Sequence, residues 1–297
     1  MCTSAHYLNN IPLVVFTDTL ATINKFTMRQ IETYIVDSFT DKPFKGNPAG
    51  VCLLQEELNE NQMLSIAQEL GLSETAFISK IKNPNHYSIR FFSPVMEIPL
   101  CGHATLASSK VIFQNEPIEE INFQNFQNLK LKINKDGEFI KMEFPVYNTV
   151  KEQVPKELLK ALGLNNIINS EFNKETKILL IEVDNSNILL NLKPNFEQLK
   201  NSHNSINGVL VTSKSNKENY DFESRYFWPW SGTNEDPVTG GTHTFLTKYW
   251  SQRLNKTKMN SFQCSQRTGF MEVELISNKK LTIKGKAQLT LKGTMFI

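Results

Sequence analysis

The chain has few cysteines, and it lacks the spacings that hold a metal ion or form a redox pair. Its four cysteines, at positions 2, 52, 101 and 264 of 297 residues, include no C-x-x-C pair. The five histidines include no pair four residues apart with a glutamate between them. We therefore predict neither a structural nor a catalytic metal. Scattered cysteines without a recognisable secretory signal favour a reducing compartment, and we expect the cytoplasm.

Long apolar runs and an excess of one charge are also missing. The apolar run at residues 11–16 is far too short to cross a bilayer, and no transmembrane segment is predicted. The net charge is only +2, and the lysines form no basic stripe. We therefore expect neither a nucleic acid nor a membrane as a partner. An apolar content of 40% and a length of 297 residues suit two domains, each with its own core.

The pattern of strands and helices repeats once along the chain. In the first half, alternation and turn signals predict strands at 31–39, 49–54, 72–78 and 87–92, a helix between Asn59 and Gly71, a buried helix at 103–113, and strands within 121–144. In the second half they predict a helix at 156–162, strands at 178–183, 188–192, 208–212 and 222–230, a buried helix at 242–250, and further strands with turns at 278–279 and Gly293.

This order predicts an α+β fold of two pseudo-symmetric domains, each a curved sheet wrapped around one central helix. We expect an N-terminal extension at residues 1–28, with Met28 as an alternative start, an N-terminal domain at 29–145 and a C-terminal domain at 146–285. A last strand near 286–297 is expected to cross back to the first domain.

Each predicted buried helix begins at a short turn that contains glycine. The first turn, at residues 100–105, includes Cys101, Gly102, His103 and Ala104; the second, at 235–243, includes Thr239, Gly240, Gly241 and Thr242. A helix start offers unpaired backbone N–H groups and the positive end of a dipole, which together bind carboxylates or phosphates. Two such starts predict one cleft that binds a small acid through the residues of both turns.

Glu74 and His103 are the leading candidates for chemistry. Glu74 lies beside apolar residues, so burial should raise its pKa and make it usable for proton transfer; an exposed surface charge is the plainer alternative. His103 is expected to face the ligand as a neutral imidazole that donates a hydrogen bond. Beside it, the Cys101 thiol would have a lowered pKa at the helix start, unless Cys101 is only a small buried residue.

Two further charged residues have open roles. Asp236 precedes Pro237 at the mouth of the second helix, where it could orient a hydroxyl or amine of the ligand or simply cap the turn. Arg267 could pair with a substrate carboxylate, although a surface arginine is the simpler interpretation.

Five motifs in order, at residues 37–40, 43–49, 72–75, 97–103 and 235–240, resemble those of the PhzF-like isomerases, a family with the diaminopimelate-epimerase fold. The resemblance covers the chain from about residue 30 to its end. It implies two pseudo-symmetric domains with the site in the cleft between them, and no cofactor. It assigns the acid/base to Glu74, and places Asn47, His103, Asp236 and the second glycine turn around the substrate.

The chain departs from the family at Gly241, where a serine is usual, so a hydroxyl that could contact substrate is missing. Our hypothesis is a cofactor-independent isomerase that moves a proton between carbons of a small carboxylate-bearing substrate. The alternatives are a racemase or epimerase that uses Cys101, weakened because the second turn has no cysteine, and a binding or scaffold protein without turnover. A homodimer is kept open as an assembly.

Overall fold

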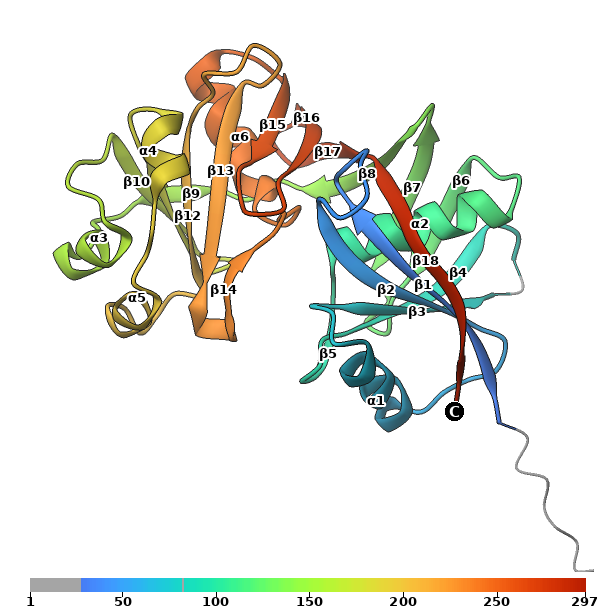
Figure 1. Ribbon diagram of the computed structural model, residues 1–297. Helices are drawn as coiled ribbons and strands as arrows, with labels where there is room; N and C mark the ends of the chain where they lie inside the picture. The colour runs from blue at the N-terminus through green and yellow to red at the C-terminus, as the bar shows by residue number, and fades with distance from the viewer. Residues whose placement is uncertain (1–27, 82) are drawn as a thin grey trace, which may run out of the picture.

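The structure, a computed structural model, describes residues 28–81 and 83–297; the predicted N-terminal extension lies outside them apart from Met28. Two lobes lie side by side, and each wraps strands around one helix (Figure 1). The first lobe contains β1 (Gln30–Ser38), β2 (Asn47–Leu54), α1 (Glu60–Leu70), β3 (Thr75–Lys80), β4 (His86–Phe92), β5 (Glu97–Ile98), α2 (Gly102–Asn115), β6 (Glu120–Gln124), β7 (Lys130–Asp136) and β8 (Phe139–Pro145).

The second lobe repeats this plan with longer connections. It contains β9 (Thr149–Lys151), α3 (Lys156–Leu162), β10 (Asn169–Asn173), β11 (Ile178–Glu182), α4 (Ser186–Asn191), α5 (Phe196–Asn201), β12 (Gly208–Lys214), β13 (Phe222–Trp228), a 3₁₀ turn η1 (Pro229–Ser231), β14 (Thr233–Asp236), α6 (His243–Leu254), β15 (Lys258–Gln263), β16 (Gly269–Ser277) and β17 (Lys280–Gly285). The last strand, β18 (Ala287–Phe296), returns to the first lobe.

Strand pairing makes the duplication explicit. In the first lobe, β1–β2, β3–β4 and β6–β7 are antiparallel, whereas β2–β3 and β4–β6 are parallel. In the second lobe, β10–β11, β12–β13 and β15–β16 are antiparallel, whereas β11–β12 and β13–β15 are parallel. The two series match pair for pair, so the α+β class with two pseudo-symmetric halves is confirmed.

The two lobes exchange their outermost strands. After β8 the chain adds β9 to β10 of the second lobe, and after β17 it adds β18 to β1 of the first. The antiparallel pair β8–β17 joins the two halves into one continuous sheet. At the far end of β18, Arg29 and Ile297 exchange two backbone hydrogen bonds, so these two residues lie side by side.

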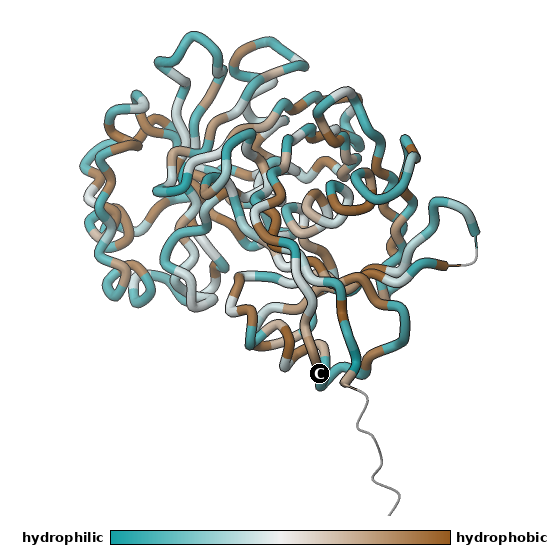
Figure 2. Tube along the Cα trace, turned by 45° about the vertical axis from the view of Figure 1, so that its right-hand side comes forward, coloured by the Kyte–Doolittle hydropathy of each residue, from teal (hydrophilic) through white to brown (hydrophobic). Residues whose placement is uncertain are grey.

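Helices α2 and α6 are central because small and apolar residues cover most of their faces. Leu106 and Ala107 of α2, and Phe245 and Leu246 of α6, are at most 1% exposed. Hydrophobic residues gather inside both lobes, and hydrophilic residues dominate the connecting loops (Figure 2). Within the described residues, none of the helices is both long enough and apolar enough to cross a membrane.

Two predicted elements are wrong. Residues 188–192 form part of helix α4 and not a strand, because the Asn185 side chain accepts hydrogen bonds from the backbone N–H groups of Asn187 and Ile188 and starts a helix there. Gly293 is not a turn, because it lies inside β18 and pairs with Thr33 of β1.

Burial of α2 predicts where truncation of a leucine is costly. Leu106→Ala, at a fully buried position, should lower the free energy of unfolding by about 2–5 kcal/mol, since it leaves a cavity. Leu190→Ala, at a helical position that is 47% exposed, should change it by about 0.5 kcal/mol or less. Urea unfolding of both variants checks this, and equal losses would contradict the central position of α2.

Candidate active site

The starts of α2 and α6 meet at a cavity of about 330 Å³ between the lobes. From the first lobe it is lined by Ser73, Glu74, Ile98, Leu100, Cys101, Gly102 and His103. From the second it is lined by Thr176, Ile178, Asn207, Tyr226, Trp228, Thr233, Asp236, Pro237, Thr239, Gly240, Gly241 and Thr242. Most of the residues predicted from the two glycine turns therefore lie in one cavity wall.

The two glycine turns approach each other closely. A Cβ atom on Gly102 would lie 4.0 Å from the Cα atom of Gly240, so the turns face one another. The first N–H bonded within α2 is that of Thr105, which donates to the Cys101 carbonyl. The preceding N–H groups of Gly102 and His103, like those of Gly241 and Thr242 across the cavity, have no backbone acceptor among the described residues. The cavity thus has the backbone donors that an anion needs.

Glu74 and His103 form a buried ion pair. Glu74 ends the turn before β3 and His103 lies in the first turn of α2; they are 8% and 7% exposed, and Glu74 Oε2 lies 3.1 Å from His103 Nε2. Burial opposes both charges. However, the hydrogen bond to His103 and its charge hold the pKa of Glu74 below its ordinary value. In turn, contacts with Cys101 and Glu74 outweigh burial and raise the pKa of His103 well above its ordinary value.

Both predicted protonation states were therefore wrong. The sequence predicted a raised pKa for Glu74 and a neutral His103, because it showed the apolar neighbours of Glu74 but not the contact between the two side chains. The contact favours the carboxylate form of Glu74 and the imidazolium form of His103. A carboxylate can accept a proton, and the neighbouring cation can stabilise negative charge.

Cys101 lies against the same imidazole, with Sγ 3.4 Å from His103 Nδ1 and 3.8 Å from Nε2. Burial raises the pKa of this thiol, and so the lowered value expected at a helix start is wrong. Cys101 is 7% exposed, which fits the alternative of a small buried residue.

Asp236 faces this pair from the second lobe. It closes β14, and the Gln263 side chain fixes the turn that follows by donating to the Asp236 carbonyl and accepting from the Thr239 N–H. The Thr239 hydroxyl donates to the Asp236 carboxylate. Loss of water around it raises the pKa of Asp236 to about 6, against the opposite effect of the His103 charge.

Three of the predicted substrate-binding residues, Asn47, Ala104 and Arg267, do not line the cavity. Asn47, fully buried at the start of β2, donates its amide hydrogens to Asp236 Oδ1 and the Val238 carbonyl, each at 2.9 Å. Its Nδ2 also lies 3.3 Å from His103 Nδ1. Asn47 therefore connects residues of both lobes and lies outside the cavity lining. Ala104 is also fully buried, behind the cavity wall.

Arg267 is not placed to bind a substrate carboxylate. Its guanidinium pairs with Asp37 at 2.7 Å and donates to the carbonyls of Lys45 and Gly46. It does not line the cavity. The side chain links the second lobe to the loop between β1 and β2, which supports the alternative in which Arg267 has no substrate contact.

An aromatic wall was missed. Tyr226 and Trp228 lie two residues apart on β13, and both line the cavity. The pairing register between β13 and β14 shifts next to Trp228, which is typical of a bulge that redirects a side chain. Their ring centroids are 6.0 Å apart, and Trp228 Nε1 is buried with no hydrogen-bond partner among the residues that the structure describes. The aromatic composition of residues 222–230 was the available signal, but it did not show which face these rings occupy.

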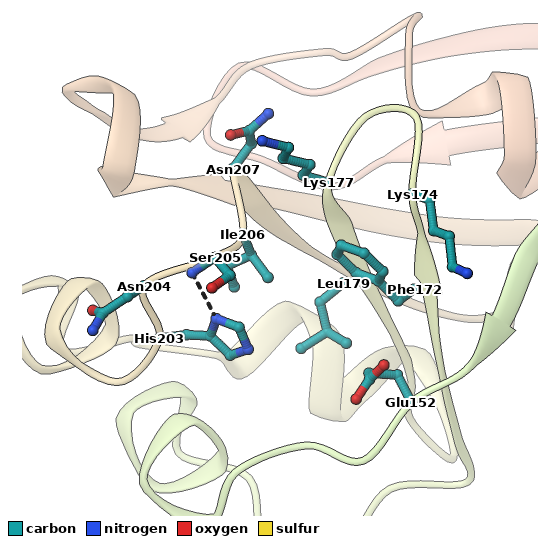
Figure 3. Close-up of a pocket in the computed structure, with 10 residues that line it drawn as sticks. All are labelled: Glu152, Phe172, Lys174, Lys177, Leu179, His203, Asn204, Ser205, Ile206 and Asn207. Atoms are coloured by element: carbon teal, nitrogen blue, oxygen red, sulfur yellow. Dashed lines mark hydrogen bonds between the residues drawn. The ribbon is translucent and has the colours of Figure 1, made fainter.

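A larger, more open hollow of about 600 Å³ lies on the other face of the second lobe's sheet (Figure 3). Lys174 and Lys177 extend into it from the hairpin between β10 and β11, above Leu179 and Ile206. The neighbours of Lys177, Thr176 and Ile178, line the smaller cavity instead. The smaller cavity is the candidate active site, since converging titratable groups with shifted pKa values are typical of active sites.

Within residues 28–81 and 83–297, one group of side chains brings three atoms of metal-ligand type close together. Glu74, Cys101 and His103 each offer one ligand atom, and these atoms lie within 4.8 Å of one another.

The duplicated architecture and the cleft with two helix starts define a protein of the epimerase-fold class. Residues 36–293 match the family described as "Phenazine biosynthesis-like protein", and the chain belongs to this family. This confirms the resemblance drawn from the five motifs. Membership supports an isomerase or epimerase role.

Individual relatives agree over nearly their whole length. The human "Phenazine biosynthesis-like domain-containing protein" is 38% identical over 287 residues, which cover 90% of this chain and 99% of that protein. An "Uncharacterized isomerase" of Halalkalibacterium halodurans is 38% identical over 268 residues, 89% of this chain and 98% of that protein. A crystal structure of a PhzF-family protein from Enterococcus faecalis has a TM-score of 0.84 at 35% identity, covering 91% of this chain and all of that one.

The ion pair predicts how His103 titrates. In the native protein its imidazolium should persist well above the ordinary pKa of a histidine, because Glu74 supports the charge. Glu74→Gln removes that charge, so the pKa of His103 should fall. Titration followed by NMR of labelled histidine measures both values, with His86, exposed on β4, as the internal reference. An unchanged His103 pKa in the variant would contradict the pairing.

Proposed function

We propose that this protein is a cofactor-independent isomerase that moves a proton between two carbons of a small carboxylate-bearing substrate. One observation carries the proposal: two carboxylates, one from each lobe, line the same cavity with their pKa values shifted in opposite directions. The pKa of Glu74 is lowered, whereas that of Asp236 is raised to about 6. Such a divergence separates a base from an acid near neutral pH.

The proposed reaction uses groups on both sides of the cavity. The substrate carboxylate would bind the N–H groups of the glycine turns, at Gly102 and Gly241. Glu74 would take a proton from a carbon of the substrate, leaving the electron pair delocalised toward the substrate carboxylate. His103 would stabilise the charge of this intermediate, and Glu74 would return the proton to another carbon. Protonated Asp236 would donate a hydrogen bond to a hydroxyl or amine of the substrate.

The name of the Halalkalibacterium halodurans relative, an isomerase, supports this class of reaction. A racemase that uses Cys101 is less well supported, because a second thiol is missing from the cavity wall; Cys264 packs in the core of the second lobe. A binding protein without turnover is the rival that Gly241 favours. Retention of the Glu74–His103 pair opposes that rival.

Replacing Glu74 tests the base. Glu74→Gln keeps the size and polarity of the side chain but cannot accept the proton, so exchange should fall about 10²-fold or more. The measurement is deuterium incorporation from D₂O into a panel of small carboxylic acids, read by mass spectrometry. Glu182→Gln is the matched control, because Glu182 is also 8% exposed but pairs with Arg253 away from the cavity.

The Cys101→Ala variant distinguishes the isomerase proposal from the racemase alternative. It should lower exchange far less than Glu74→Gln does, because the thiol has no partner across the cavity. An inactive Cys101 variant beside an active Glu74 variant would reverse the assignment. If no acid of the panel exchanged in the native protein, the binding-protein alternative would be favoured.

The raised pKa of Asp236 predicts one limb of the pH profile of deuterium exchange. If its protonated form donates to substrate, exchange should decrease as the pH rises through about 6, where this carboxyl loses its proton. Asp236→Asn keeps a donor at every pH, so this limb should disappear. Profiles of deuterium exchange between about pH 4 and 9, a range that includes the ordinary pKa values of carboxyl and histidine side chains, check this for both proteins. A limb that survives in Asp236→Asn would assign it to another group.

A further inference from the structure

The loop between β1 and β2 is bonded to the second lobe near both of its ends. Near its start, the Phe39 carbonyl accepts a hydrogen bond of 2.9 Å from the Phe270 N–H. At its end, the Gly46 N–H donates to the Thr268 carbonyl at 2.8 Å, and Arg267 donates to the Gly46 carbonyl. None of these five residues lines the cavity, so their contacts join the lobes without reaching the candidate site.

Asn47, the next residue along the chain, extends this junction to the cavity wall. Its amide nitrogen donates to Asp236 Oδ1 and to the Val238 carbonyl, each at 2.9 Å. The opposite amide orientation would place an oxygen against both acceptors, so these two contacts define how the group lies. Asn47 Oδ1 is buried with no partner among the residues that the structure describes, although an unpaired buried acceptor is costly. The donor contacts therefore hold this side chain in place.

The carboxyl group of Asp236 accepts one hydrogen bond from each lobe. Asn47 of the first lobe donates to Oδ1, and the Thr239 hydroxyl of the second lobe donates to Oδ2. One contact on each oxygen fixes the plane of the carboxyl group, and the contact from Asn47 also fixes it relative to the first lobe. The same amide nitrogen lies 3.3 Å from His103 Nδ1. Both amide hydrogens are already used, so Asn47 packs against the imidazole and spaces it from Asp236.

We propose that Asn47 is a positioning residue, which holds the carboxyl group of Asp236 opposite the Glu74–His103 pair. Asn47 acts through Asp236, because it lies outside the cavity lining. A group that donates to substrate must be held close to its productive geometry, and supporting hydrogen bonds supply that precision. The inference rests on the proposed role of Asp236 in the isomerase, whereas the effect of Asn47 on the ionisation of Asp236 needs no substrate.

The Asn47 amide stabilises the ionised form of Asp236, because it donates to a carboxylate oxygen and so lowers the pKa. The other titratable groups that face this carboxyl are Glu74, His103 and Tyr226. The pKa of Glu74 is lowered, and those of His103 and Tyr226 are raised. Near pH 6, Asp236 is therefore the member of this set that changes charge. Removing Asn47 leaves the other three groups in place, so the pKa of Asp236 should rise.

The first test uses the native, full-length protein and needs no variant to fold. NMR of isotope-labelled protein follows the Asp236 carboxyl carbon and the Asn47 side-chain amide between about pH 4 and 9. Both signals should change with one midpoint, at about 6, because the amide donates to the titrating oxygen. The Asn125 amide is the internal reference, since it is also buried but donates to the Pro99 carbonyl. Different midpoints for Asn47 and Asp236 would overturn the proposal.

The second test removes the donor. In Asn47→Ala the pKa of Asp236 should rise by about one to two pH units, the effect of one hydrogen bond to a charged group. Arg267→Lys is the matched control, because it keeps a positive charge beside Asp37 but loses the fork that binds the loop carbonyls. It weakens the junction without touching Asp236. An unchanged pKa in Asn47→Ala, or an equal rise in Arg267→Lys, would contradict the positioning role.

Deuterium exchange then separates positioning from a general loss of structure. In Asn47→Ala the limb assigned to Asp236 should move to higher pH by the same amount as its pKa, and the rate below that limb should fall by up to about 10²-fold. A merely structural role would lower the rate by one factor at every pH and leave the limb in place, which would overturn the proposal. The NMR tests stand even if no acid exchanges, and their failure leaves the proposed role of Glu74 untouched.

Discussion

The contact between the two glycine turns is the constraint on which the rest of the site depends. Gly102 and Gly240 lie so close that a side chain on the first would touch the backbone of the second. This approach brings two helix starts to one cavity and lets Asn47 bond to Asp236 across the lobes. Without it, Glu74 and His103 would form a pair on one lobe with no carboxylate opposite. The pKa divergence between Glu74 and Asp236 follows from the same contact.

The two halves share a fold but differ in electrostatics. His103 at the start of α2 has Glu74 beside it, and its pKa is raised. His243 at the start of α6 forms hydrogen bonds with the Thr239 carbonyl and the Ser261 hydroxyl, and burial lowers its pKa to about 4. The surroundings therefore favour a charged histidine in one copy and a neutral histidine in the other. The repeated fold forms the cleft, whereas the different contacts of His103 and His243 make the two sides of the cleft electrostatically different.

Much of the fold was predictable, because strand alternation, the Asn59 cap and glycines after helices are local signals. The order of these signals gave the duplicated α+β plan. The strand predicted at residues 188–192 was wrong because their apolar run resembles a strand. The helix depends on hydrogen bonds from backbone N–H groups to the Asn185 side chain, which form only in the folded chain. The turn predicted at Gly293 was wrong because the sequence alone does not distinguish a glycine inside a strand from a glycine in a turn.

The sequence predicted that Glu74, His103 and Asp236 would lie around one cavity, but it did not predict the direction of their pKa shifts. Glu74, His103 and Asp236 occur in motifs, yet their protonation depends on which side chains meet after folding. Arg267 shows the same limit, because its partner Asp37 is 230 residues away along the chain. The convergence of Glu74 and Cys101 on one imidazole also could not be predicted from their spacing along the chain. These properties belong to tertiary contacts.

The pairing of β18 with β1 also brings the two ends of the described chain together. Arg29 and Ile297 exchange backbone hydrogen bonds, so the path from residue 29 to residue 297 is nearly a closed ring. The strand pairs of such a ring do not depend on where along the chain the termini lie. A circularly permuted chain, joined at these ends and reopened in an exposed loop of either lobe, could form the same strand pairs. The present order of the two halves is then one of several that the architecture allows.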